Sequence, residues 1–121
     1  SLNGRIPSTE AAEYSAMKAA LNNVSRSLAL ELAPKGVRVN VVSPGPVLTD
    51  IQTRADGIAA QVVAASGGTI DDYVAGLEQE MPLGRWAQPE EIASVVVSLL
   101  SEKFGYVTGA DVAVDGAVQS G

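Results

Sequence analysis

Tyr14 and Lys18 are the residues best suited to chemistry, and they lie in the segment Tyr14-Ser15-Ala16-Met17-Lys18. A spacing of four on a helix places the two side chains on one face, one turn apart. A phenol has an ordinary pKa of about 10, and a nearby ammonium group favours its ionised form. The pair is suited to general acid/base catalysis, and the alternative is an ordinary pair of side chains on a helix surface.

Two other segments carry groups that could act with this pair. Ser1 lies thirteen residues before Tyr14, and its hydroxyl could hydrogen-bond a carbonyl oxygen beside the phenol. Residues 44–49 follow an expected strand, and ligands of open α/β sheets bind at the carboxyl ends of strands. Within this segment Gly45 would let a ligand approach the backbone, and Thr49 offers a hydroxyl. Taken by itself, the segment is interpreted only as a turn.

The composition excludes several classes of site and partner. The 121 residues fit one small domain and include neither cysteine nor histidine. Disulfides, the usual zinc centres and histidine-based triads are therefore excluded, and we expect no metal site. The formal charge of −6 disfavours nucleic acid and anionic membranes as partners. No apolar run is long enough to span a bilayer, and we expect a cytoplasmic protein without membrane or nucleic-acid partners.

Periodic apolar residues predict the helix that carries the Tyr-Lys pair. They recur at steps of three and four from Met17 to Leu32, which defines one helical face. We expect this helix to run from Ser8 or Thr9, with Thr9 as its N-cap, to Ala33. The proline and glycine that follow disfavour further helix.

The remaining regular elements follow from β-branched runs and helix-start signals. Residues 37–42 predict a strand buried on both faces of a parallel sheet, ended by a Ser-Pro-Gly-Pro run. Pro89 and the two glutamates after it predict a second helix, with an apolar stripe as far as Leu100. Residues 110–114 predict a short final strand.

The stretch of about 50–84 is predicted to form a flap with two short helices, 51–65 and 73–77, and with Thr69 as a helix cap. Trp86 is interpreted as a structural residue that packs the flap onto the body. Five flap side chains either line an apolar pocket or only form the apolar face that any flap helix needs: Ile51, Ile58, Val62, Val63 and Tyr73.

The order helix, strand, flap, helix, strand predicts an α/β fold with parallel strands. Two strands are too few to cover two long helices, because parallel sheets contain several strands with helices on both faces. The first residue, Ser1, is not a methionine. We therefore expect the chain to be a piece of a longer domain.

Five segments, in this order and spacing, resemble the C-terminal half of the short-chain dehydrogenase/reductase family. They are Ser1 with its thirteen-residue gap, YSAMK at 14–18, RVNVVSPGPVLTD at 38–50, PLGRWAQPEEIA at 82–93 and YVTGADVAVDGA at 106–117. The resemblance covers essentially the whole chain. It implies that residues 1–121 form the C-terminal half of one Rossmann-like domain, a doubly wound parallel sheet with its substrate-binding flap at about 50–84.

The resemblance also implies an NAD(P)-dependent oxidoreductase that transfers hydride between the nicotinamide and a carbonyl or alcohol carbon. It makes Tyr14 the acid/base, Lys18 the residue that assists Tyr14, and Ser1 the hydroxyl that polarises the substrate carbonyl. Either NAD or NADP is the cofactor. The implied cofactor contacts are Tyr14, Lys18, Pro44, Gly45, Val47 and Thr49.

Two further expectations come from the resemblance. A small carbonyl or alcohol compound would be the substrate, and the helix of residues 9–33 would join copies into a homodimer or homotetramer. The family's glycine-rich phosphate loop has no counterpart in these residues. The alternative to an enzyme is therefore that this stretch, by itself, is an inactive structural or oligomerisation module.

Overall fold

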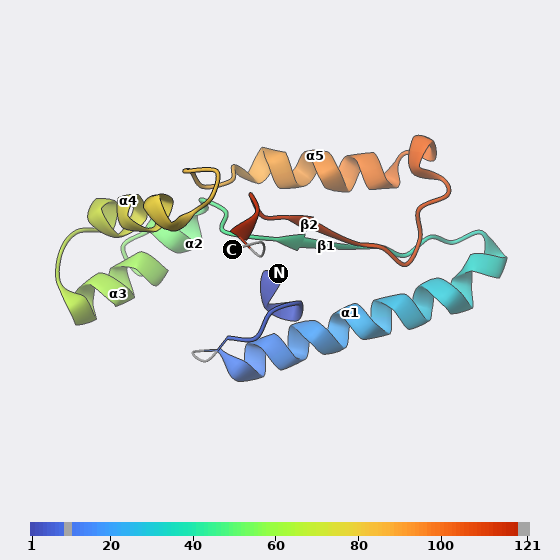
Figure 1. Cartoon of the computed structure of the whole chain (residues 1–121), viewed down its shortest axis with the longest axis horizontal. Coiled ribbons are helices and arrows are strands. Elements are labelled where there is room, and N and C mark those ends of the chain that lie inside the picture. The colour runs from blue at the N-terminus through green and yellow to red at the C-terminus, as the bar shows by residue number, and fades with distance from the viewer. Residues whose placement is uncertain (9–10, 119–121) are drawn as a thin grey trace.

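The computed structural model describes residues 1–8 and 11–118, which form a parallel strand pair between two helices. Strand β1 (Val41–Pro44) pairs in parallel with β2 (Asp111–Val114). Figure 1 shows helix α1 (Ala12–Leu32) on one face of this pair and helix α5 (Pro89–Leu100) on the other. The predicted α/β fold, its parallel strands and the order of its elements are confirmed.

The helix that carries the Tyr-Lys pair begins later than predicted. The start at Ser8 is wrong, because α1 begins at Ala12, and the expected cap Thr9 lies outside the described residues. A short 3-10 helix, η1 (Leu2–Gly4), contacts α1 further along. A Cβ on Gly4 would lie only 3.0 Å from the carbonyl oxygen of Lys18. η1 therefore lies beside the turn of α1 that carries Lys18 and is not a continuation of the helix start.

The end of α1 agrees with the prediction to within one residue. The helix stops at Leu32 and tightens into the 3-10 helix η2 (Ala33–Lys35). Gly36 then adopts the left-handed conformation, with φ of 73°, that favours glycine at a helix end.

The first strand lies further along the chain than the predicted 37–42. Side chains take part in the contacts just before it, since the backbone N–H of Val39 donates to Thr108 Oγ1 and that of Ala110 to Asn40 Oδ1, both at 3.1 Å. Alternate residues of β1 direct their N–H groups toward β2, and Val41 and Gly45 donate to it. An N–H at position 44 would point away from β2, so Pro44 is tolerated there. Burial on both faces was also predicted, but within β1 only Ser43 is fully buried.

The flap lies beyond the carboxyl ends of both strands and contains helices α2 (Asp50–Thr53), α3 (Ile58–Ser66) and α4 (Ile70–Glu80) (Figure 1). The single helix predicted for 51–65 is wrong. The chain doubles back after α2 so tightly that a Cβ on Gly57 would lie 2.6 Å from the carbonyl oxygen of Ile51. The second flap helix is longer than the predicted 73–77.

The predicted cap of that second helix is confirmed. The Thr69 hydroxyl accepts a hydrogen bond from the Asp72 N–H at 3.1 Å, and the Asp72 carboxylate accepts one from the Thr69 N–H at 3.1 Å. This reciprocal pair satisfies two N–H groups that a helix start otherwise leaves without partners.

Trp86 and an ion pair join the flap to α5. Trp86 is 3% exposed, and its indole N–H donates to the carbonyl oxygen of Val74 in α4 at 3.2 Å, which confirms its structural role. Arg85 binds both carboxylate oxygens of Glu91 at 2.8 Å, and Glu91 also accepts from the N–H of Gln88 at 2.8 Å. No helix in the described part of the chain is long and apolar enough to cross a membrane.

The pairing of Arg85 with Glu91 predicts a specific loss of stability in acid. The Arg85 hydrogen bond, followed by that of the Gln88 N–H, lowers the pKa of Glu91 from 4.5 to about 2. Because the lowered pKa belongs to the folded state, the pair stabilises the fold fully above about pH 4.5 and loses its effect as the pH falls toward 2. We expect Glu91→Gln to lower the unfolding temperature of the intact protein at pH 7.

That difference should shrink between about pH 5 and pH 2. The matched control is Glu102→Gln, which removes one carboxylate from the exposed 3-10 helix η3 (Glu102–Phe104). A difference for Glu91→Gln that stays constant over the whole pH range would contradict the role of the ion pair.

Candidate active site

Helix α1 brings Tyr14 and Lys18 together as their spacing predicts. The ammonium nitrogen of Lys18 lies 5.2 Å from the centre of the Tyr14 ring, a cation–π distance. Tyr14 is 43% exposed, so a ligand can reach its side chain. The arrangement places a proton donor beside a fixed positive charge.

A chain of hydrogen bonds connects Ser1 to the residue next to Tyr14. Ser1 caps η1, where its hydroxyl donates to the amide oxygen of Asn3 and accepts from the Asn3 N–H, both at 3.3 Å. The Asn3 amide nitrogen in turn donates to the hydroxyl of Ser15 at 3.4 Å, and Ser15 is buried in α1. Asn3 and Ser15 could not be predicted from the sequence, because neither has a spacing that indicates chemistry.

The Ser1 segment also packs against the helix that carries Lys18. Because η1 contacts α1 closely at Gly4, the Ser1 segment is held against the helix turn that carries Lys18. The three predicted catalytic residues therefore belong to one region of the molecule.

A cavity of about 380 Å³ opens where η1, the end of β1 and the flap meet. The cavity is lined by three residues of the predicted site, Ser1, Pro44 and Gly45. Two of the flap side chains predicted as possible pocket residues, Ile58 and Tyr73, also line it. Its walls are mainly apolar with a few polar groups, which is typical of small-molecule sites. The cavity lies at the carboxyl ends of the strands, where the sequence predicts ligand binding.

The other predicted cofactor contacts lie further along the same segment. Val47 forms a parallel bridge with Ala87, and Thr49 stands at the N-cap position of α2. Gly45 has a structural role that was not predicted, because a Cβ there would lie 2.8 Å from the Cα of Asp115. Within the described residues, no group of three or more acidic side chains is arranged to hold a metal ion.

Comparison with known proteins identifies the fold to which this geometry belongs. The family model for enoyl-(acyl carrier protein) reductase matches residues 1–119. The chain belongs to the short-chain dehydrogenase/reductase family. It is 38% identical over 121 residues to the acetoacetyl-CoA reductase of Cupriavidus necator (strain H16), covering 100% of this chain and 44% of that protein.

Solved structures of the family superpose on most or all of the chain. A short-chain dehydrogenase family protein from Francisella tularensis matches with a TM-score of 0.92 and 35% identity, covering 100% of this chain and 49% of that one. The L-sorbose reductase of Gluconobacter frateurii, complexed with NADPH and L-sorbose, matches with a TM-score of 0.76 and 35% identity over 85% of this chain and 38% of that one. These matches confirm the predicted Rossmann-like fold, and the chain spans less than half of each relative's length.

The close approach of Gly45 to Asp115 generates a prediction about stability. A Cβ at 2.8 Å from a backbone atom cannot be relieved by rotating a side chain, so Gly45→Ala must displace the chain at the edge of the cavity. We expect a loss of about 1–3 kcal/mol in the free energy of unfolding, measured by urea denaturation of the intact protein.

Gly76→Ala is the matched control. Gly76 lies inside α4 with open space where a Cβ would stand. Replacing a helical glycine by alanine is expected to stabilise the fold by about 0.5–1 kcal/mol. Equal effects of the two substitutions would contradict the importance of the Gly45–Asp115 contact.

Proposed function

We propose that this chain carries the catalytic centre of an NAD(P)-dependent oxidoreductase, which reduces a carbonyl compound or oxidises the corresponding alcohol. The observation that carries the proposal is the Lys18 ammonium 5.2 Å from the centre of the Tyr14 ring, on the helix that also holds the Ser1 segment. The Cupriavidus necator relative is an acetoacetyl-CoA reductase, which supports carbonyl reduction. The Gluconobacter frateurii relative was solved with NADPH, which supports a nicotinamide cofactor.

The residues around the cavity fit the nicotinamide end of such a cofactor. The backbone of Pro44 and Gly45 forms a wall at the carboxyl ends of the strands, where dinucleotides bind in Rossmann folds. Outside the cavity lining, Lys18 and Tyr14 on α1 offer donors to ribose hydroxyls, and Val47 and Thr49 follow Gly45 along the chain. When bound, the reduced nicotinamide supplies the hydride.

The chain's own residues handle the carbonyl oxygen and its proton. Ser1 turns its hydroxyl proton from the Asn3 amide oxygen to that oxygen and orients the carbonyl toward Tyr14. Tyr14 gives its hydroxyl proton to the oxygen as negative charge develops there. Lys18 stabilises the negative charge that the proton leaves on the phenol oxygen, because its ammonium stands beside the ring. Alcohol oxidation runs through the same groups in reverse.

Two further parts of the proposal concern the organisation of the protein. Residues 1–121 make up the C-terminal half of one Rossmann-like domain, with the flap at 50–84 contacting a small carbonyl or alcohol substrate. Helix α1, whose small and apolar side chains suit close packing, joins copies into a homodimer or homotetramer. Analytical ultracentrifugation of the intact protein tests this assembly, and a monomer would contradict it.

The alternative is that residues 1–121, produced by themselves, form an inactive structural module. The two can both hold, because the proposed centre acts in the intact protein. A titration of residues 1–121 with NADH and NADPH tests the alternative, and saturable binding in the micromolar range would overturn it. We expect no saturable binding in the micromolar range, because the adenine half of the cofactor has no predicted binding residues in this chain.

Substitution of Tyr14 tests the proposed chemistry. We expect Tyr14→Phe to lower kcat for acetoacetyl-CoA reduction by the intact protein about 100- to 10,000-fold, since it removes the proton donor and little else. The dissociation constant for NADPH, measured by fluorescence titration, should change less than about threefold.

Tyr106→Phe is the matched control, because Tyr106 is fully exposed in the segment before β2 and has no part in the proposed site. It should leave kcat unchanged. Wild-type turnover by the Tyr14→Phe variant would refute the role given to Tyr14.

A further inference from the structure

The carboxylate of Asp111 forms a buried junction between four segments of the chain. Its side chain is 6% exposed. One carboxylate oxygen accepts a hydrogen bond from the Ser43 hydroxyl at 2.7 Å, and Ser43 is fully buried. The other accepts from the amide of Asn22 at 3.2 Å and lies 3.6 Å from the Arg5 guanidinium.

Each partner of Asp111 lies next to a different part of the proposed site. Asn22 follows Lys18 by one helical turn, so Tyr14, Lys18 and Asn22 share one face of α1. Ser43 directly precedes the Pro44–Gly45 wall of the cavity. Arg5 directly follows η1, the helix that Ser1 caps.

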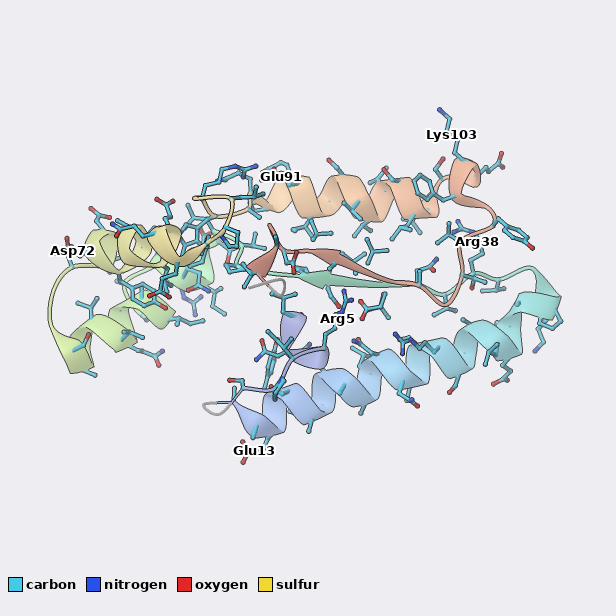
Figure 2. All side chains as sticks on the ribbon, in the orientation of Figure 1. Arg5, Glu13, Arg38, Asp72, Glu91 and Lys103 are labelled. Carbon is cyan, nitrogen blue, oxygen red and sulfur yellow. The ribbon has the colours of Figure 1, made fainter. Side chains whose placement is uncertain are left out.

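The contacts of Asn22 and Arg5 hold η1 against both α1 and the strands. The Asn22 amide lies 3.5 Å from the Gly4 carbonyl oxygen as well as bonding Asp111. Figure 2 shows Arg5 reaching from the end of η1 toward the strands. The Ser1 segment therefore depends on Asp111 through two independent contacts, one direct and one through Asn22.

A buried carboxylate is an expensive way to stabilise a fold. Well-packed apolar side chains often stabilise as much or more, because removing a charge from water costs free energy that its partners only partly return. A carboxylate instead orients its hydrogen-bond partners, since its oxygens hold donors at defined distances and angles. Here the donors belong to the segments that carry Ser1, Lys18 and the wall of the cavity.

We infer that Asp111 is a positioning residue that aligns Ser1 with Tyr14 and Lys18 and with the end of β1. The inference rests on the proposed function. Asp111 has no proposed contact with substrate or cofactor and acts only through Arg5, Asn22 and Ser43. A displacement of about 1 Å between reacting groups can reduce a rate 100-fold, so losing the junction should lower turnover more than binding.

The Asp111→Asn substitution tests this role in the intact protein. The amide keeps the shape of the side chain but turns one acceptor into a donor and removes the charge that pairs with Arg5. We expect kcat for acetoacetyl-CoA to fall about 10- to 100-fold, while KM and the dissociation constant for NADPH stay within about threefold. The control, Glu102→Gln, removes an exposed carboxylate outside the junction and should leave kcat unchanged.

Arg5→Met is the second variant, needed in case Asp111→Asn fails to fold. The Arg5 side chain is 35% exposed, so its loss should be tolerated by the fold. The two substitutions change the local charge in opposite directions. A similar loss of kcat in both variants, with unaltered pH profiles, is the result expected of lost positioning.

Two results would overturn the inference. One is wild-type kcat in a folded Asp111→Asn or Arg5→Met variant. The other is a pair of pH profiles shifted in opposite directions, which would show that Asp111 acts only through its charge. If Tyr14→Phe is inactive while these variants are not, positioning by Asp111 is wrong but the proposed function stands. If Tyr14→Phe is also fully active, the proposed function itself fails.

Discussion

The carboxylate of Asp111 accepts hydrogen bonds from Ser43 and Asn22 and pairs with Arg5 inside the molecule. Without this junction, η1 would still be held against α1 by the Asn3–Ser15 hydrogen bond and the buried Leu2 side chain, but it would lose its polar link to β2. The position of Ser1 depends on η1, and the cavity wall depends on the end of β1. A single buried charge therefore holds together segments that are far apart in the sequence and that the proposed chemistry needs side by side.

The flap is attached to this body in a different way. Its α4 helix meets the body through the indole of Trp86, and the Arg85–Glu91 ion pair fixes the following segment to the start of α5. The flap side chains in the cavity, such as Ile58 and Tyr73, come from helices separate from α1. Changes in the flap can therefore alter the shape of the cavity without moving Tyr14 or Lys18.

Features that depend on neighbouring residues could be predicted from the sequence. The Tyr14–Lys18 contact follows from helical spacing, and the start of α5 at Pro89 follows from the preference of proline for a first helical position. The shift of β1 could not be predicted, because it depends on the Thr108 hydroxyl, 69 residues away from its partner Val39.

Asp111 could not be found for the same reason. Its partners Asn22 and Ser43 lie 89 and 68 residues away, and a lone aspartate at the start of a strand has no periodic signal. The split between α2 and α3 depends on the close approach of Gly57 to Ile51 rather than on apolar periodicity. Long-range polar contacts and tight backbone approaches are thus the features that the sequence pattern predicts least well.

The most direct test of the proposed chemistry is to follow the hydride. The intact protein is incubated with acetoacetyl-CoA and either NADH or NADPH deuterated at C4 of the nicotinamide, and the product is examined by mass spectrometry. We predict 3-hydroxybutyryl-CoA that carries one deuterium at the new alcohol carbon. The absence of deuterated alcohol from acetoacetyl-CoA, ethyl acetoacetate and L-sorbose alike, with both cofactors, would contradict a hydride-transfer centre built from Ser1, Tyr14 and Lys18.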